Sequence, residues 1–292
     1  MKIGIIDVDG HDFPNLALMK ISAWHKSKGD SVEWYEPLLS GHCEKVYMSK
    51  VFTFTPDYEY FIDANEVIRG GTGYKLYDKN LPTDMDEIFP DYSIYPQYDY
   101  AIGFLTRGCI RKCKWCVVPK KEGDLKPYCD WKSIRRADTN KIVFMDNNVL
   151  ASDHGIDQIR QMIGEDVRID FNQGLDARLI TDEIAEMLSR IKWIRFIRLA
   201  CDTSAMIPVV TEAVHKLERY GVKPYRIFVY TLIQDVDEAY QRIKALDELG
   251  VDPFAQPYRD FETNYIDPEH KRLARWCNHK GIHKTVKFED YK

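Results

Sequence analysis

From residue 100 to the C-terminus, short apolar runs alternate with longer amphipathic stretches. The runs are rich in β-branched and aromatic residues and are bounded by turn residues, which is typical of buried strands. The runs are 100–105, 141–145, 167–171, 194–199, 226–232 and 253–258, and the helices expected among them are 155–163, 181–191, 208–220, 235–249 and 268–278. This alternation predicts an α/β fold with parallel strands. Six strand–helix units predict a partial, open (β/α)6 barrel of the TIM type over residues 100–292.

The first 99 residues predict a separate, smaller domain. A buried strand over Lys2–Asp7 precedes a helix over 16–28, which Asn15 caps and Gly29 ends. Further strands are expected at 31–35, 44–49 and 66–71. This order predicts a Rossmann-like, doubly wound α/β domain over residues 1–99. Its last part, from about residue 74, reads as a linker rich in proline and tyrosine.

Composition narrows the class of protein. The chain has 292 residues, of which 45% are hydrophobic, so it can bury a large core. Its formal net charge of −5 does not favour broad electrostatic capture of nucleic acid, and we expect a small-molecule substrate instead. No apolar run approaches the length of a membrane span, and the N-terminal run is too short for a signal peptide. We therefore expect a protein of the reducing cytoplasm, with no membrane partner.

One motif carries the chemistry. Cys109, Cys113 and Cys116 form a C-x3-C-x2-C triplet directly after the first predicted barrel strand. Thiolates hold iron–sulfur clusters, and three of them leave one iron of a four-iron cluster without a protein ligand. Half of a structural zinc site is the alternative, although the other cysteines are scattered singly and supply no second pair. A disulfide framework is disfavoured by the odd number of cysteines.

The triplet, with Trp115 just before its last cysteine, resembles the cluster loop of the radical S-adenosylmethionine (SAM) enzyme superfamily. The resemblance implies a [4Fe-4S] cluster on Cys109, Cys113 and Cys116, with SAM bound at the open iron. It also implies reductive cleavage of SAM to a 5′-deoxyadenosyl radical, which abstracts hydrogen from a substrate that the sequence does not identify. A reductant such as flavodoxin or ferredoxin would supply the electron. The basic run beside the triplet either receives that partner or is a solvated loop.

Polar residues follow several of the apolar strands, at the ends where ligands of such barrels bind. The resemblance implies that residues after the second strand contact the SAM amine, a residue after the fourth meets the ribose, and an apolar pair after the fifth lines the adenine. The predicted cofactor-binding residues are Trp115 beside the cluster, Asp146 and Asn147 for the amine, Arg178 for the SAM carboxylate or for Asp176, Asp202 for the ribose, and Leu232 and Ile233 for the adenine.

Four further strand-end residues are predicted to face the substrate. Gln173 follows the third strand, Tyr258 and Arg259 follow the sixth, and Cys201 follows the fourth. Cys201 would donate a hydrogen atom to a substrate radical, although a lone cysteine is more often an inert small hydrophobe.

The first domain resembles the cobalamin-binding-type domain that precedes many radical SAM barrels. Its Asp9-Gly-His11 follows the first strand, as in the base-off cobalamin motif, in which the histidine ligates cobalt. Pro14 stands where that motif has glycine. We therefore expect a degenerate Rossmann-like domain, with cobalamin bound through Asp9 and His11 as the alternative.

Several functions compete with the general radical SAM prediction. A cobalamin-dependent radical SAM methyltransferase follows if the first domain binds corrin. A non-catalytic iron–sulfur protein or a zinc-stabilised binding module follows if the triplet has no SAM chemistry. Methylthiolation of tRNA calls for further cysteines in the first domain, and peptide modification often brings auxiliary clusters; the sequence has neither.

Overall fold

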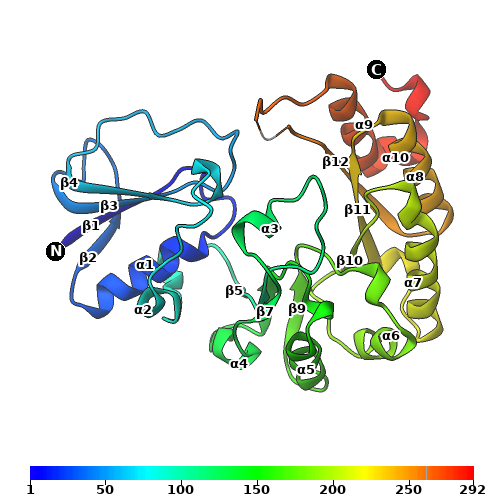
Figure 1. Cartoon of the computed structure of the whole chain (residues 1–292), viewed down its shortest axis with the longest axis horizontal. Coiled ribbons are helices and arrows are strands. Elements are labelled where there is room, and N and C mark those ends of the chain that lie inside the picture. Colours follow the sequence, from blue (N-terminus) through cyan, green and yellow to red (C-terminus); the bar gives the residue numbers. More distant parts are fainter. Residues whose placement is uncertain (261) are drawn as a thin grey trace. The chain divides into compact units, whose positions relative to one another are not determined.

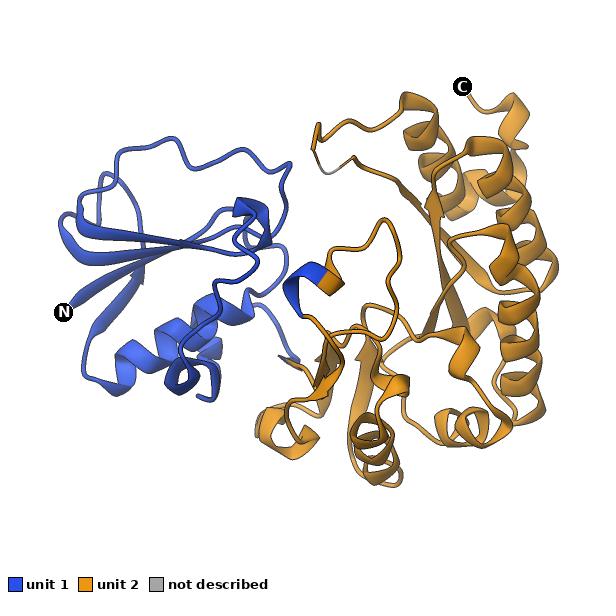
Figure 2. Cartoon of the chain, viewed as in Figure 1, with its two compact units in different colours: residues 1–102, 120–122 blue, residues 103–119, 123–292 orange. Residues whose placement is uncertain are grey.

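The computed structural model describes residues 1–260 and 262–292. The chain divides into two compact units (Figure 2). Unit 1 comprises residues 1–102 and 120–122, and unit 2 comprises residues 103–119 and 123–292. Each unit is described by itself.

Unit 1 contains a four-stranded sheet in the order β2-β1-β3-β4. Its strands are β1 (Lys2–Asp7), β2 (Ser31–Trp34), β3 (Cys43–Ser49) and β4 (Ala64–Gly70). All three neighbouring pairs are parallel. The predicted α/β class with parallel strands is therefore confirmed in this unit.

The two faces of this sheet are covered differently. Helices α1 (Leu16–Ser27) and α2 (Thr83–Asp86) lie on one face (Figure 1), where Leu18 and Met85 pack against Ile3 and Ile5. A loop covers the other face, through Tyr58 and other residues of 50–63. The fold thus differs from a doubly wound sheet, because the segment 50–63 has no helical period.

The predicted linker is an ordered strap on α1. Asp86 accepts a hydrogen bond from Lys20 at 2.9 Å, and Trp24 donates to Asp84 at 2.7 Å. Asp91 accepts from Ser22 and Lys26, each at 2.6 Å. Burial raises the pKa of Asp91, but hydrogen bonds from Lys26, Ser22 and Ser93 bring it down to about 2. Polar contacts therefore hold the strap along the helix. Two 3-10 turns, Thr72–Tyr74 and Tyr92–Ile94, lie in this part of the chain.

The six predicted barrel strands form two three-stranded sheets, β5-β8-β9 and β10-β11-β12. The strands are β5 (Ala101–Gly103), β8 (Lys141–Phe144), β9 (Arg168–Phe171), β10 (Ile197–Ala200), β11 (Ile227–Ile233) and β12 (Asp252–Pro257). The β8–β9, β10–β11 and β11–β12 pairs are parallel. Two isolated parallel bridges involve the neighbouring strands of the two sheets: Ile169 of β9 pairs with Trp193, and Leu199 of β10 pairs with Leu175. Over the described residues the strands form no closed barrel.

Helices follow these strands (Figure 1). They are α5 (Asp153–Gln161), α6 (Asp182–Ser189), α7 (Ile207–Arg219), α8 (Val236–Glu248), α9 (Pro268–Asn278) and α10 (Lys280–Thr285), with 3-10 turns at Val149–Ala151, Ala177–Leu179, Ser204–Met206, Pro224–Arg226 and Phe288–Asp290. Ile243 and Leu273 form a core with Ile233 at the end of β11. Helix α10 extends the fold beyond the last predicted helix.

The structure also contains a small antiparallel strand pair that the sequence did not predict. Strands β6 (Thr106–Arg107) and β7 (Lys126–Pro127) pair antiparallel and close the loop that carries the cysteine triplet. Gly108 has a φ of +84°, and a Cβ there would lie 2.3 Å from the Asp124 carbonyl oxygen, so glycine alone fits. Short helices α3 (Val118–Lys121) and α4 (Trp131–Ile134) complete this region.

Across the described residues, none of the helices combines the length and the apolar character needed to span a membrane.

Candidate functional site

The cysteine triplet lies on the loop that the β6–β7 hairpin closes. The Cys109 N–H donates to the Gly123 carbonyl at 3.4 Å, and the Cys116 N–H donates to the Cys113 carbonyl at 3.1 Å. All three side chains are partly buried. Burial raises the pKa of Cys113, Arg178 lowers it and Cys109 raises it, so these groups lie within electrostatic range of one another. Among the described residues, no three His, Cys, Asp or Glu side chains are already arranged as a metal site.

Asp146 anchors the start of this loop. Its carboxylate is buried and accepts from the Leu105 N–H at 3.0 Å, the Thr106 N–H at 2.6 Å and the Thr106 hydroxyl at 2.7 Å. Burial raises the pKa of Asp146 to about 6. Both of its oxygens are therefore engaged with the chain, which makes Asp146 a support of the loop more readily than a contact of a ligand amine.

The next two residues have unsatisfied amide oxygens. The Oδ1 atoms of Asn147 and Asn148 are buried and have no hydrogen-bond partner among the described residues. The Asn148 side chain is only 3% exposed, and its Nδ2 lies 3.5 Å from Cys109 Sγ and 3.3 Å from Asp176 Oδ2. Buried acceptors without a partner are costly, so these oxygens point to a donor that a ligand would supply. Asn147 was predicted to bind the cofactor, whereas Asn148, in the same polar stretch, had no predicted role of its own.

Asp176 joins the cysteine loop to the segment after β9. It accepts from Arg111 Nε at 2.9 Å and, in a bidentate pair, from Arg178 Nε at 2.6 Å and Nη2 at 3.1 Å. Burial raises the pKa of Asp176, but the two arginines lower it below its usual value. Arg178 was predicted to pair either with the SAM carboxylate or with Asp176, and in the structure it forms an ion pair with Asp176. The Arg178 side chain is still 39% exposed, so its guanidinium has room for a second anion.

Strand alternation separates the predicted residues at the ends of β10 and β11. Asp202 accepts from the Leu232 N–H at 3.2 Å, and Trp115 lies close enough to lower the pKa of this carboxyl. Burial raises the pKa of Asp202, although Arg242 and Arg178 are close enough to oppose that rise. Trp115, Asp202 and Leu232 are therefore gathered beside the cysteine loop.

Their strand neighbours face the helices. Ile233 is fully buried in the core with α8 and α9, on the opposite face from Leu232. Cys201 is likewise fully buried, and its Sγ contacts the Thr203 carbonyl at 3.9 Å. Burial raises the pKa of Cys201 to about 11. These surroundings are those of an inert structural cysteine.

The three other residues predicted to face the substrate are Gln173, Tyr258 and Arg259. Gln173 is exposed. The Tyr258 N–H extends the β11–β12 ladder by donating to the Ile233 carbonyl at 2.9 Å. Arg259 donates to the Asn264 carbonyl at 3.0 Å. These contacts give no indication of chemistry for the three side chains.

Sequence reasoning missed a partly buried charged pair, Arg198 and Asp170. Arg198 Nε and Nη2 each lie 2.7 Å from an oxygen of Asp170, and Arg198 Nη1 lies 3.0 Å from the Tyr230 hydroxyl. That hydroxyl donates to the Asn172 carbonyl at 2.8 Å. Charged residues inside two of the apolar runs were the available signal. The pair connects β9 to β10 and β11 below the strand ends.

The predicted cobalamin residues are engaged within unit 1. Asp9 accepts from the Val51 N–H, the Phe52 N–H at 3.2 Å and the Thr55 hydroxyl at 2.6 Å. The His11 ring lies against Trp34 in a tilted arrangement, with centroids 4.2 Å apart and an interplanar angle of 33°. Asp9 therefore holds the loop after β3, while His11, which is exposed, lies against Trp34.

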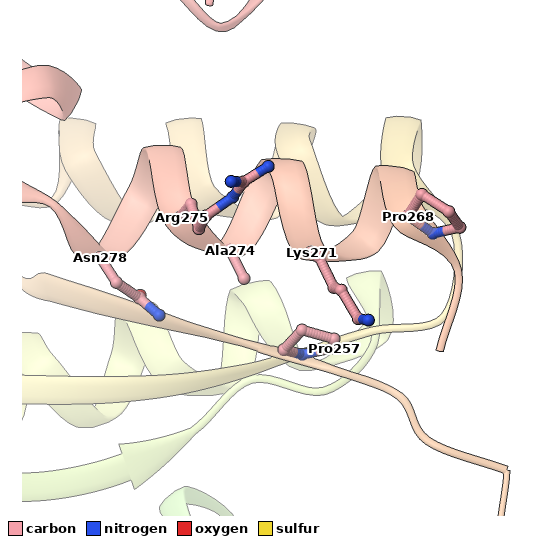
Figure 3. A pocket seen from close by; sticks show the side chains of 6 residues that line it. All are labelled: Pro257, Pro268, Lys271, Ala274, Arg275 and Asn278. Carbon is pink, nitrogen blue, oxygen red and sulfur yellow. The ribbon is translucent and has the colours of Figure 1, made fainter. Parts of the chain in front are cut away.

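A cavity between β12 and α9 lies apart from these residues. It is lined by Pro257, Pro268, Lys271, Ala274, Arg275 and Asn278. Figure 3 shows that Lys271 and Asn278 point toward β12 whereas Arg275 points away, so its polar groups do not converge. The cavity contains none of the predicted site residues.

Comparison of the chain with models of known protein families finds no match, and a search of curated proteins finds no match either.

Proposed function

We propose that the chain is a radical SAM enzyme that binds a [4Fe-4S] cluster and SAM and abstracts hydrogen from a small-molecule substrate. The observation that carries the proposal is the set of three partly buried thiols on one clasped loop, beside the unpartnered amide oxygens at the end of β8. A donor set of three thiols and neutral acceptors suits a cluster with one open iron and an amine-bearing ligand. The two three-stranded sheets, with their parallel pairs β8–β9, β10–β11 and β11–β12, support the finer interpretation as an open (β/α)6 barrel.

The residues of the candidate site take the following roles in this proposal. Cys109, Cys113 and Cys116 hold three irons, and the oxygens of Asn147 and Asn148 accept from the SAM amine. The exposed face of Arg178 pairs with the SAM carboxylate while Asp176 holds its other face. Asp202 accepts from ribose hydroxyls, and Leu232 lies under the adenine. When bound, the reduced cluster supplies the electron that cleaves SAM to methionine and a 5′-deoxyadenosyl radical.

The reductant in this proposal is flavodoxin or ferredoxin. Lys112 and Lys114 on the cysteine loop are exposed and offer positive charge to an acidic electron carrier. A reducing cytoplasm suits both the carrier and the free thiols of the triplet.

The test is SAM cleavage by the full chain. After anaerobic reconstitution, reduction with dithionite in the presence of SAM should release 5′-deoxyadenosine, detected by chromatography. Cys113→Ala should abolish the product and lower bound iron, whereas Cys43→Ala, which removes a cysteine of β3, should retain both. A bound cluster without cleavage would favour electron transfer, and bound zinc without sulfide would exclude the proposal.

A further inference from the structure

Asn148 donates toward the sulfur of a predicted cluster ligand. Its Nδ2 lies 3.5 Å from Cys109 Sγ, within the longer range of hydrogen bonds to sulfur, and 3.3 Å from Asp176 Oδ2. An amide nitrogen has two hydrogens, so one is available for each acceptor. The side chain is buried, where a hydrogen bond is electrostatically stronger than in water.

The orientation of this amide is determined by its neighbours. Turning the amide over would bring Oδ1 toward both the Asp176 carboxylate and the Cys109 sulfur, which are acceptors. Asp176 is itself fixed by Arg111 and Arg178. The Asp176 carboxylate, fixed by two ion pairs, therefore orients the Asn148 amide so that its N–H points to the Cys109 sulfur.

We infer that Asn148 is a positioning residue that raises the reduction potential of the cluster by donating its amide N–H to the Cys109 thiolate. The inference rests on the proposed function, since it concerns the cluster that the triplet would hold. Reduction adds negative charge to the cluster and its sulfurs, and a hydrogen bond to sulfur stabilises the reduced state more than the oxidised state. Hydrogen bonds to cluster sulfurs and groups behind the ligands are established determinants of potential.

The experiment is a redox titration of the reconstituted full chain, followed by electron paramagnetic resonance of the reduced cluster. Asn148→Ala and Asn148→Leu both remove the donor, and the leucine also keeps the volume filled. Each should lower the midpoint potential by about 59 mV, which is a tenfold change in a one-electron equilibrium constant. Asn140→Ala, at the other end of β8, is the matched control and should leave the midpoint unchanged.

The outcomes separate this inference from the proposed function. Unchanged midpoints in both variants, with iron content retained, would overturn the inference and leave the radical SAM proposal standing. Loss of iron from both variants would overturn it in favour of a purely structural role for Asn148. A native chain that binds no iron and cleaves no SAM would overturn both.

Discussion

The carboxyl ends of the parallel strands differ sharply between the two units. In unit 1, Asp9 is saturated by the loop after β3, Asp7 accepts from the Tyr95 hydroxyl, and Asn15 donates to Ser49 at 2.8 Å. In unit 2, Asn147 and Asn148 have amide oxygens without partners among the described residues. Both ends are polar in sequence, but the polar groups named in unit 1 satisfy one another.

This difference shows how a ligand site is recognised in an α/β fold. Polar residues at strand ends mark the place where ligands bind in such folds. They indicate a ligand only when the folded chain leaves their donors or acceptors unmatched, because a buried unmatched group is costly. By that criterion the unmatched amide oxygens of Asn147 and Asn148 favour the proposed site in unit 2.

The largest expected contrast is in stability when one carboxylate is removed from each unit. Asp146→Ala leaves two buried N–H groups and a buried hydroxyl unpaired, so we expect a loss of about 4 kcal/mol in the free energy of unfolding. Asp9→Ala exposes its donors on a loop that water reaches, and we expect about 1 kcal/mol. Urea unfolding followed by tryptophan fluorescence measures both. Equal losses would contradict the contrast.

The next effect is a pH dependence carried by Asp146. Burial raises its pKa in the folded chain to about 6, from an ordinary 3.8, so the folded state binds the proton more tightly. Its contribution to stability is therefore complete below pH 4 and is lost as the pH rises through 6. The stability of the native chain relative to Asp146→Asn should fall by about 3 kcal/mol between pH 4 and pH 7. Urea titrations across that range check it, and a difference that stays constant or rises would refute it.

A smaller effect is expected from the strap of unit 1. Tyr95 is fully buried, and its hydroxyl donates to Asp7. Tyr95→Phe removes that donor from a partly buried carboxylate and should cost about 1 kcal/mol. Tyr98→Phe is the control, because the Tyr98 hydroxyl donates to the His11 carbonyl at an exposed position. Thermal unfolding of the two variants should place Tyr95→Phe clearly lower; indistinguishable midpoints would argue against a structural role for the Asp7–Tyr95 contact.

The smallest effect is an expected zero. Because Asp9 and His11 are engaged within unit 1, hydroxocobalamin should cause no saturable change in visible absorption with the native chain or with His11→Ala. Spectrophotometric titration makes the measurement. A saturable change that His11→Ala abolishes would restore the cobalamin-dependent methyltransferase and remove the distinction between the two units.

Sequence reasoning succeeded for features that depend on the local pattern of apolar and polar residues. The strands and helices follow from apolar runs and amphipathic stretches, and the predicted cap is confirmed, because Asn15 accepts from the Leu18 N–H. The prolines of the last strand suit an edge position, and β12 is an edge strand. These features depend on residues that are close together in the chain.

It was less informative where orientation depends on tertiary packing. The hairpin strands β6 and β7 have two residues each, which is too short for any period to be visible. Asp146 precedes Asn147 and Asn148 at the same strand end, and only the turn into Val149–Ala151 decides which of them faces the cysteines. For Leu232 and Ile233, however, the two-residue period already implied that only one would face a ligand.

The outer edge of β12 has a consequence for how the chain behaves among its own copies. The residues whose backbone faces away from β11 are Pro253, Ala255 and Pro257. The prolines have no N–H, and the side chain of Asn278 binds both the N–H and the carbonyl of Ala255, at 2.8 and 2.9 Å. The Asn278 amide thus makes the two hydrogen bonds that a neighbouring strand would make with Ala255, and these three residues offer no unbonded N–H to another strand. This edge of the sheet therefore lacks the backbone donors that templated addition of another strand requires.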